Sequence, residues 1–415
     1  MKVNHHWAIF INNSSDKQTF IAELFDNTAP KGFESLMHKR GRLFSKLALD
    51  EFMDEEDRHG QKVIAQDADQ SLRSMSSGEQ KKVLLKHILK SEPDYIILDN
   101  PFDNLDIDAQ QTLRETLNRI SKATALILLI SRKEDILPIF NQFATLNGKE
   151  ITFLDHLDNH HKSGLKFKAK LPAPLSKIEI EGNTLIELKS INVSYSGRPI
   201  LKNINWKIVK GDFWQLVGKN GSGKTTILSM ITGENPKGYG QELYIFGQKK
   251  GSGESVWDIK KRIGYFTPSM TDKFMGYHTV EHMLISGLTD SIGLYTIPSE
   301  AQLRLAKEWL QLIDMFEQRH TLFHELTMGQ KRLVMTARAM VKHPLLLILD
   351  EPTAGLDDSS AAKLIALVNK MAKESVTAII FVSHRTEKGL KPSHTFELQL
   401  SNEGSTGYIK QQEPR

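Results

Sequence analysis

A glycine-rich segment in the second half of the chain has the residues and the spacing of a phosphate-binding loop. The strand-like run FWQLV at 213–217 leads into GKNGSGKTT and then into the helix-like ILSMITG. Glycines let successive backbone N–H groups face phosphates, and the helix adds its positive N-terminal end. In this pattern Lys224 reaches the β- and γ-phosphates of a nucleotide, and Thr225 can ligate Mg²⁺. The predicted ligands are Gly218, Lys219, Asn220, Gly221, Ser222, Gly223, Lys224, Thr225 and Thr226.

Two adjacent carboxylates and a histidine follow apolar runs farther along the chain. Asp350 and Glu351 come directly after LLLIL, and His384 ends IIFVSH. A buried carboxylate is costly unless a metal or a substrate uses it, although an acidic turn of purely structural role is the alternative. We predict that Asp350 holds Mg²⁺ and that Glu351 accepts a proton from an attacking water. His384 is predicted to hydrogen-bond the γ-phosphate and that water.

Aromatic and histidine residues give weaker signals. Tyr195 lies 23 positions before Gly218, where its ring could stack on adenine; packing within a strand is the alternative reading. The pairs His5–His6 and His160–His161 lack a second pair of ligands at a useful spacing for zinc. We therefore interpret these histidines as surface residues.

A long segment of the chain occurs twice. The run SMSSGEQKKVLLKHILKSEPDYIILDNPFDNLD, from Ser74, recurs as ELTMGQKRLVMTARAMVKHPLLLILDEPTAGLD, from Glu325. In both copies 21 positions separate a glycine, Gly78 or Gly329, from the aspartate that ends the apolar run. Each copy predicts a glycine-containing turn, an amphipathic helix and a strand buried on both faces of a parallel sheet. The chain is therefore an internal duplication of an α/β unit.

The two copies differ in length and are separated by a polar stretch. Residues 155–181 include HHKSGLKFKAKLPAPL, whose Pro, Gly and Lys content is typical of a linker. We expect one domain at 1–154 and a second at 182–415. The first copy spans 61 positions from Lys17 to Gly78, whereas the second spans 105 from Lys224 to Gly329. The first domain has thus lost material, which we expect to be helical.

Composition excludes several classes of function. The 415 residues are 40% hydrophobic and 25% charged, and 54 Lys+Arg against 50 Asp+Glu give a net charge of +4. This surplus gives no argument for a nucleic-acid partner. The absence of cysteine excludes disulfides and thiol catalysis and favours the cytoplasm. The N-terminus lacks a signal-like segment and no apolar run approaches the roughly 20 residues that span a bilayer, so any membrane role is expected through a partner.

The phosphate-binding loop, the segments MSSGE and LTMGQ, LDEPTAGLD and the terminal SH together resemble the ATP-binding cassette (ABC) ATPase family across nearly the whole chain. More narrowly, KGSGESVWDIKKRIGYF at 250–266, ISGLTDSIGLY at 285–295 and ARAMVKHPLLLILDEP are similar to tandem soluble ATPases of the ModF or PhrA type, encoded near bacterial molybdate-transport genes. The resemblance implies an α/β fold with two tandem P-loop NTPase domains. Each would have a mostly parallel sheet flanked by helices and a helical subdomain, the first being truncated and degenerate.

The resemblance also implies that the two halves pair head to tail around ATP. Each nucleotide would lie between the phosphate-binding loop of one half and the signature segment of the other. The second-half loop would face Ser76, Gly78 and Glu79, whose helix would aim its N-terminal N–H groups at the γ-phosphate. The first-half loop, residues 11–19, would face Thr327, Gly329 and Gln330.

The first half departs from the family pattern within its own site. Its loop INNSSDKQT has Ile11, Ser14 and Asp16 where the second half has glycines, although the lysine is retained as Lys17. These changes reduce backbone freedom and place a negative charge beside the phosphates. Asn100 stands at the position of Glu351, and Arg132 at that of His384. An amide cannot act as a general base, so we expect poor ATP binding and no hydrolysis there.

Three classes of function are compatible with these residues, with ATP and Mg²⁺ as the expected cofactors. The first is a soluble ATPase whose halves close on ATP as a mechanical or regulatory switch. The second is the energy-coupling subunit of a molybdate-type ABC transporter, with a membrane permease as its protein partner. After IGYF, where transporter ATPases usually carry a glutamine, this chain has Thr267, Pro268 and Ser269, which favours the switch. Retention of Glu351 and His384 argues against the third class, a non-enzymatic ATP-binding scaffold.

Overall fold

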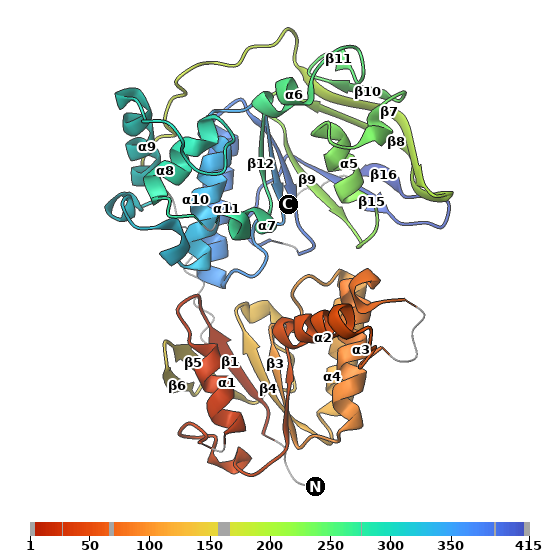
Figure 1. Ribbon diagram of the computed structural model, residues 1–415, viewed down its shortest axis with the longest axis vertical. Helices are drawn as coiled ribbons and strands as arrows, with labels where there is room; N and C mark the ends of the chain where they lie inside the picture. Colours follow the sequence, from red (N-terminus) through yellow and green to blue (C-terminus); the bar gives the residue numbers. More distant parts are fainter. Residues whose placement is uncertain are drawn as a thin grey trace. The chain divides into compact units, whose positions relative to one another are not determined.

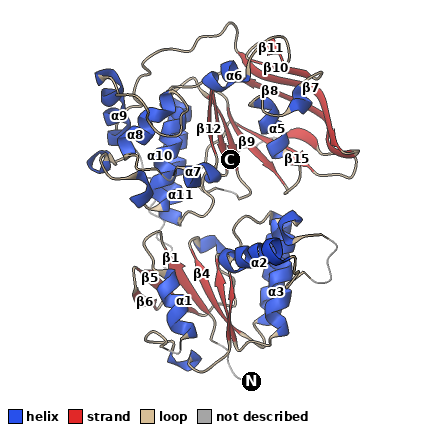
Figure 2. Cartoon of the chain, viewed as in Figure 1, coloured by secondary structure: helices blue, strands red, loops and turns tan. Residues whose placement is uncertain are grey.

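The chain forms two compact units, each built around a six-stranded sheet (Figures 1 and 2). The computed structural model describes residues 5–26, 28–65, 70–156, 167–274, 276–385 and 387–410. The first unit comprises Met1–His161 with Gly355–Asp358, and the second comprises Lys162–Ala354 with Ser359–Arg415. Within the described ranges, no helix is both long and apolar enough to cross a bilayer.

The sheet of the first unit is parallel except at one edge. Its strands are β1 (Trp7–Ile11), β2 (Gly41–Phe44), β3 (Tyr95–Asp99), β4 (Ala125–Ile130), β5 (Gln142–Asn147) and β6 (Glu150–Leu154). They lie in the order β2-β3-β4-β1-β5-β6, and β6 runs antiparallel to β5. The central strands read YIILD and ALILLI and are almost wholly buried. Such unbroken apolar runs are typical of strands covered on both faces.

Helices cover the two faces of this first sheet. On one face α1 (Lys17–Phe25) packs Phe20 against Ile97. On the other face α2 (Lys46–His59), α3 (Ser77–Lys90) and α4 (Ile107–Ile120) pack against Ile96 and Leu98. The division follows from the alternation of side chains along β3. The 3₁₀ turns of this unit are η1 (Glu34–Leu36), η2 (Leu72–Ser74) and η3 (Lys133–Asp135).

The second unit repeats the strand order of the first. Its main sheet contains β9 (Phe213–Gly218), β12 (Ile263–Phe266), β13 (Leu346–Asp350), β14 (Ala378–Val382), β15 (His394–Gln399) and β16 (Thr406–Lys410). The order is β12-β13-β14-β9-β15-β16, parallel except for β16. Each position in this order has a counterpart in the first sheet, with β13 matching β3 and β14 matching β4. The predicted duplication of an α/β unit is confirmed.

The second unit also carries an antiparallel sheet that the sequence analysis missed. Its strands β7 (Thr184–Tyr195), β8 (Arg198–Val209), β10 (Glu242–Ile245) and β11 (Gln248–Lys249) lie in the order β11-β10-β7-β8. Trp206 and Leu243 of this sheet share a core with Ile227 of α5 (Lys224–Ile231) and Leu216 of β9. The phosphate-binding loop therefore joins a strand and a helix that are both fixed in one core.

The remaining helices of the second unit are α6 (Val256–Arg262), α7 (Pro268–Lys273), α8 (Val280–Ile285), α9 (Glu300–Leu312), α10 (Met328–Met340) and α11 (Asp358–Glu374). Short 3₁₀ turns are η4 (Pro236–Gly238), η5 (Ser286–Leu288), η6 (Phe316–Gln318) and η7 (Phe323–Glu325). Helix α8 packs against α9 and α10, and α10 reaches β12 and β13. In the described part of the first unit, α2 and η2 are the only helical segments between β2 and α3. The missing material is therefore partly helical, as expected, and partly the strands equivalent to β10 and β11.

Part of the polar stretch between the two sheets packs on the second unit. Within 155–181, residues 157–166 lie outside the described ranges. Ile178 and Ile180 pack against the core of the second unit, and the Leu171 N–H donates to Glu374 Oε2 at 3.0 Å. This stretch therefore contributes apolar contacts to the core of the second unit as well as connecting the two units.

Candidate active site

The loop between β9 and α5 requires glycine for both conformation and space. Gly221 and Gly223 have φ of 77° and 91°, in the left-handed region that other residues rarely adopt. A Cβ on Gly223 would lie 2.5 Å from Leu201 Cδ2. The glycines predicted from the sequence are thus explained by the structure of the loop itself.

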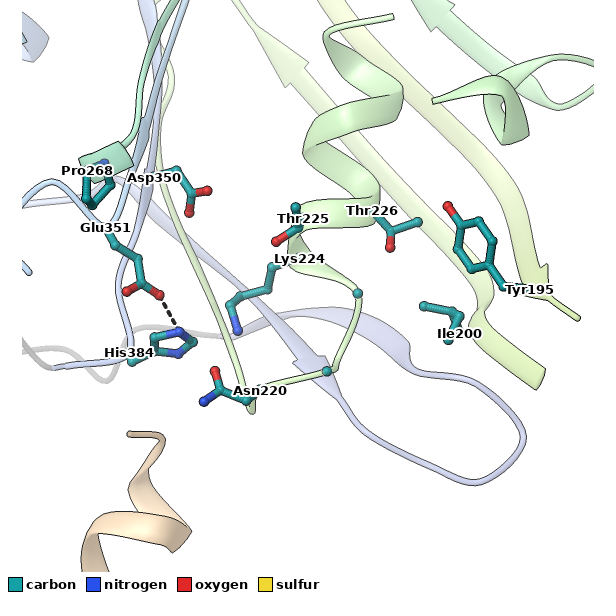
Figure 3. A pocket seen from close by; sticks show the side chains of 12 residues that line it. Tyr195, Ile200, Asn220, Lys224, Thr225, Thr226, Pro268, Asp350, Glu351 and His384 are labelled. Carbon is teal, nitrogen blue, oxygen red and sulfur yellow. Dashed lines mark ion pairs between the residues drawn. The ribbon is translucent and has the colours of Figure 1, made fainter. Parts of the chain in front are cut away.

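Lys224 is the first residue of α5, and its buried amine is held by the loop. Its Nζ donates to the carbonyl oxygens of Gly218, at 2.7 Å, and Lys219, at 3.0 Å. Asn220 and the first-turn residues Thr225 and Thr226 line the cavity beside it (Figure 3). A fixed cation at the N-terminus of a helix is a favourable setting for an anion.

The carboxylates occupy a sharp turn at the end of β13. Asp350 is the last residue of the strand, and Glu351 follows with a left-handed φ of 51°. A left-handed backbone costs about 1–2 kcal/mol for a residue other than glycine. The Glu351 N–H donates to Val382 O of β14 at 3.0 Å, which holds the turn. The turn directs the Glu351 side chain toward His384 (Figure 3).

Glu351 and His384 are in direct contact. The Glu351 Oε1 carboxylate oxygen pairs with His384 Nε2, as the dashed line in Figure 3 marks. In a neutral imidazole this pairing places the proton on Nε2. His384 Nδ1 is buried and has no hydrogen-bond partner within the described part of the chain. The structure thus brings together the two residues that the sequence assigned to the attacking water.

Asp350 lies in surroundings that favour a nearby cation. Burial, with the neighbouring charge of Glu351, raises the pKa of Asp350 to about 6, against the opposing effects of nearby Lys224 and His384. Asp350 and Thr225 line one cavity and offer hard oxygen ligands of the kind that Mg²⁺ prefers. Among the described residues, no group of three or more His, Cys, Asp or Glu could hold a metal alone. The residues fit a Mg²⁺ whose other ligands are phosphates and water.

One cavity of about 460 Å³ collects these groups. This volume lies within the range of roughly 300–1,000 Å³ that small-molecule sites show. Tyr195, at the end of β7, is 41% exposed on its rim, and its hydroxyl accepts a hydrogen bond from Asn235 Nδ2 at 2.7 Å. The lining residues are Tyr195, Ile200, Asn220, Gly221, Gly223, Lys224, Thr225, Thr226, Pro268, Asp350, Glu351 and His384.

The corresponding loop of the first unit satisfies its own hydrogen bonds. The Ser14 N–H donates to Asn12 Oδ1 at 2.8 Å, and the Asp16 N–H donates to Gly148 O at 2.7 Å. Both N–H groups occupy positions that face phosphate in a working loop. Lys17 Nζ lies 2.7 Å from Asp99 Oδ2, the counterpart of Asp350. Internal bonds thus occupy groups that a nucleotide would need.

The acidic turn of the first unit keeps its backbone but not its chemistry. Asn100 has a left-handed φ of 43°, and its N–H donates to Leu129 O at 2.9 Å, as Glu351 does to Val382. Its Oδ1 accepts hydrogen bonds from the Ser131 N–H and Oγ, at 3.0 and 3.1 Å. An amide in this position can orient Ser131 but cannot accept a catalytic proton.

The two signature segments begin their helices with the same cap. At α3 the Glu79 N–H donates to Ser76 Oγ at 3.3 Å, and the Ser76 N–H donates to Glu79 Oε2 at 2.8 Å. The Ser76 side-chain and backbone hydrogen bonds lower the pKa of Glu79. Thr327 and Gln330 form the equivalent capping box at α10. The two sequence matches therefore correspond to equivalent local structures.

Comparison with known proteins assigns the family. A family model described as ABC transporter matches residues 201–354, which contain the second-half loop, signature segment and acidic turn. The chain is also 38% identical over 335 residues to the ABC transporter ATP-binding protein ModF of Escherichia coli (strain K12). That alignment covers 77% of this chain and 68% of ModF. The chain belongs to the ABC transporter ATP-binding protein family.

Further relatives agree with this ABC assignment. An uncharacterized ABC transporter ATP-binding protein of Schizosaccharomyces pombe is 30% identical over 76% of this chain and 66% of its own length. The chain thus spans about two thirds of these relatives. Among solved structures, a model of ribosome-bound archaeal Pelota and ABCE1 matches 97% of the chain with a TM-score of 0.65 and 16% identity. A structure of RNase-L Inhibitor matches the same share with a TM-score of 0.62, also at 16% identity. At these identities the likeness shows the tandem ABC fold alone.

One histidine lies where the sequence analysis did not expect it. His6 is 8% exposed, and its Nδ1 accepts a hydrogen bond from the Leu126 N–H at 3.2 Å, so it is not a surface residue. It lies just before β1, where its ring also packs edge-on against Phe140. His5 is exposed as predicted, whereas His160 and His161 lie outside the described residues.

Sequence reasoning missed several residues around this ABC site. Ile200 forms an apolar wall of the cavity, and Pro268, noted only as a departure from the family, lines it near Asp350 (Figure 3). A turn signal, Ser196–Gly197 between two alternating runs, could have placed Ile200 near Tyr195. No local signal reveals the hydrogen bond between Thr353 and Glu387, because it joins segments that are distant in the chain.

Proposed function

We propose that the second half binds Mg-ATP in this cavity and hydrolyses it to ADP and phosphate. The observation that carries the proposal is the convergence of three devices on one 460 Å³ cavity. They are a lysine held at a helix N-terminus, a carboxylate suited to a cation, and a carboxylate paired with an imidazole. Membership of the ABC family supports nucleotide as the ligand.

Each group has a distinct task in this proposal. Lys224 and the N–H groups of the loop hold the β- and γ-phosphates, and the exposed ring of Tyr195 supports the adenine. Thr225 and Asp350 hold Mg²⁺, which when bound neutralises charge on the phosphates. Glu351 accepts the proton of the attacking water.

His384 completes this arrangement from the next strand. Its Nε2 already contacts Glu351, so the imidazole can orient the carboxylate and the attacking water together. A base placed within hydrogen-bond reach typically contributes about 10²–10⁴-fold to the rate.

We propose that hydrolysis is confined to the second-half loop. In the first half Asn100 stands at the position of the base. The strand registers make Leu129 the counterpart of Val382, so Ser131 is the counterpart of His384, and the sequence prediction of Arg132 at that position is wrong by one residue. The Lys17–Asp99 ion pair and the hydrogen bonds of Ser14 and Asp16 further support a loop that does not take phosphate. One ATP would then be hydrolysed per chain in each cycle.

We also propose that the two domains, 1–154 and 182–415, pair in the ATP-bound state. The active composite site would then join the second-half loop to Ser76, Gly78 and Glu79. The intact cap of α3 supports this role, because it fixes the first N–H groups of a 14-residue helix. The signature segment of a domain with a degenerate loop would thereby serve the other domain.

The work coupled to this ATPase is proposed to be a switch rather than transport. The Thr267 Oγ1 and Ser269 Oγ hydroxyls bond to each other at 2.8 Å, and Pro268 begins α7, so the glutamine usual in transporters has no equivalent. The alternative, an energy-coupling subunit that meets a membrane permease, is favoured by the 38% identity to a protein named as an ABC transporter ATP-binding protein.

Hydrolysis without a membrane distinguishes these alternatives. We expect the purified full chain to hydrolyse Mg-ATP in detergent-free buffer, with phosphate release measured at saturating ATP. The Glu351→Gln protein, prepared in the same way, controls for contaminating ATPases. Activity that arises only when a membrane fraction is added would favour the transporter subunit, and its absence under both conditions would contradict the ATPase.

A further inference from the structure

A second buried carboxylate lies close to the Glu351–His384 pair but does not line the cavity. Glu387 is 8% exposed, and its Oε1 accepts a hydrogen bond from Thr353 Oγ1, which is 4% exposed. Placing a carboxylate out of water is costly unless strong hydrogen bonds compensate. A residue that only filled space could be apolar, so the polar pair calls for another explanation.

The Thr353–Glu387 bond joins the two segments that carry Glu351 and His384. Thr353 lies in the turn after Glu351, which is closed by the Ala354 N–H donating to Glu351 O at 3.1 Å. Glu387 follows His384 by three positions along the chain, after the end of β14. The acidic turn is therefore bonded to the segment around His384 at two points: by the Glu351 N–H to Val382 O bond before His384, and by the Thr353–Glu387 bond after it.

The Thr353–Glu387 bond matters most for the position of the backbone around His384. Strand β14 ends at Val382, so no strand hydrogen bonds fix the backbone beyond it. Ser383 Oγ bonds to the N–H and the carbonyl oxygen of Arg385, each at 3.0 Å, which shapes the turn locally. Glu387 provides a tie from this turn to the acidic turn. A shift of His384 by about 1 Å can cost up to about 10²-fold in rate.

The first half supplies an internal comparison. Phe102 stands at the position of Thr353 and is buried, and a buried carboxylate, Asp135, lies in the segment after β4, as Glu387 lies in the segment after β14. Asp135 lies 3.8 Å from Arg114, whose guanidinium sits 4.6 Å from the centre of the Phe102 ring. The first half thus buries a carboxylate after the equivalent strand without a hydroxyl–carboxylate bond to the acidic turn, because Phe102 has no hydroxyl. The half that has Glu351 and His384 is the half that has this bond.

We propose that Thr353 and Glu387 are positioning residues, which hold the His384 turn against the acidic turn so that His384 stays aligned with Glu351. The inference rests on the proposed function and adds residues that do not touch the nucleotide. Its signature is a lower kcat with an unchanged KM, because the phosphate-binding loop and Tyr195 are unaffected.

The test is Thr353→Val in the full chain, which removes the hydroxyl with little change in volume. We expect kcat for ATP hydrolysis to fall about tenfold, with the KM for ATP unchanged, and Thr353→Ser to restore most of the rate. Thr377→Val is the matched control, since this buried threonine donates to Pro344 O at 2.7 Å just before β14, at the opposite end from His384. It should lower the thermal midpoint comparably and leave kcat unchanged.

A double variant separates the inference from the function on which it rests. In a His384→Ala background, Thr353→Val should lower kcat no further, because its effect acts through His384. A full additional tenfold loss there would overturn the inference, as would wild-type kcat in Thr353→Val while His384→Ala is impaired. Equal kcat losses in Thr353→Val and Thr377→Val would also overturn it. Wild-type turnover in His384→Ala would overturn the proposed role of His384 itself, and the inference with it.

Discussion

Lys17 Nζ lies 2.7 Å from Asp99 Oδ2 in the first unit, whereas its counterpart Lys224 bonds to the carbonyl oxygens of its own loop. The two halves thus retain the same lysine and use it differently. Lys17 forms an ion pair with a carboxylate of the protein, whereas the ammonium group of Lys224 lines the same cavity as Asp350. The difference predicts that removing Lys224 affects ATP binding and that removing Lys17 does not.

Lys224→Ala should abolish ATP binding, because it removes the side-chain cation that this loop offers to the β- and γ-phosphates. Lys17→Ala is the matched control and should leave ATP affinity unchanged, since that amine already pairs with Asp99. Isothermal titration calorimetry with Mg-ATP measures both variants. Unchanged affinity in Lys224→Ala would contradict the assignment of the loop.

Glu351→Gln should lower turnover by about 10²–10⁴-fold, the usual loss on removing a general base, while ATP still binds. The amide can keep a contact with His384 but cannot accept the proton. Single-turnover hydrolysis together with ATP binding measures the two effects. Asn100→Asp is the control in the first half and should leave turnover unchanged, and a comparable loss there would place hydrolysis in the other half.

Much of the candidate site could be predicted because its determinants are local in the sequence. The loop from Gly218 to Thr226 and the acidic turn at Asp350 each combine a strand end with neighbouring functional residues, so spacing alone locates them. In the strand order, β13, β14 and β9 are parallel neighbours, so their carboxyl ends lie side by side, and His384 lies next to Glu351.

Other features could not be predicted because they depend on contacts between distant segments. The Lys17–Asp99 pair joins the start of α1 to the end of β3, and the Thr353–Glu387 pair joins the segments that follow β13 and β14, so neither pair has a local sequence pattern. His6 was wrongly predicted to be a surface residue, because its burial depends on Leu126 in the neighbouring strand β4. The antiparallel sheet was overlooked although β7 and β8 show period-two alternation in part.

His6 should make the stability of the first unit depend on pH. Burial lowers its pKa from 6.5, against a hydrogen bond to the Ser121 backbone, so the folded state holds the neutral ring. Below about pH 6.5 the unfolded chain binds a proton that the folded unit does not, so the free energy of unfolding decreases as the pH is lowered. His6→Asn keeps an acceptor for the Leu126 N–H but cannot be charged.

Urea unfolding followed by tryptophan fluorescence at pH 7.5 and pH 5.5 checks this prediction. His6→Asn should lower the stability at pH 7.5, because the ring contact with Phe140 is lost, and should make the loss on acidification smaller. The second unit is the same in both proteins, so the difference between them reports on His6. Equal losses on acidification would contradict a neutral His6.

Substitutions of the two signature glycines, Gly78 and Gly329, distinguish which composite site is active. Gly78→Asp should abolish single-turnover hydrolysis at saturating ATP, because it would place a carboxylate against the γ-phosphate held by the second-half loop. A Cβ at this position would lie 3.3 Å from Ala109 Cβ, so Gly78→Ala controls for size without charge. Gly329→Asp puts the same charge before the degenerate loop, where Asn100 replaces the base, and should reduce turnover much less. The reverse order, with Gly329→Asp the more damaging, would mean that hydrolysis occurs at the first-half loop despite its Asn100.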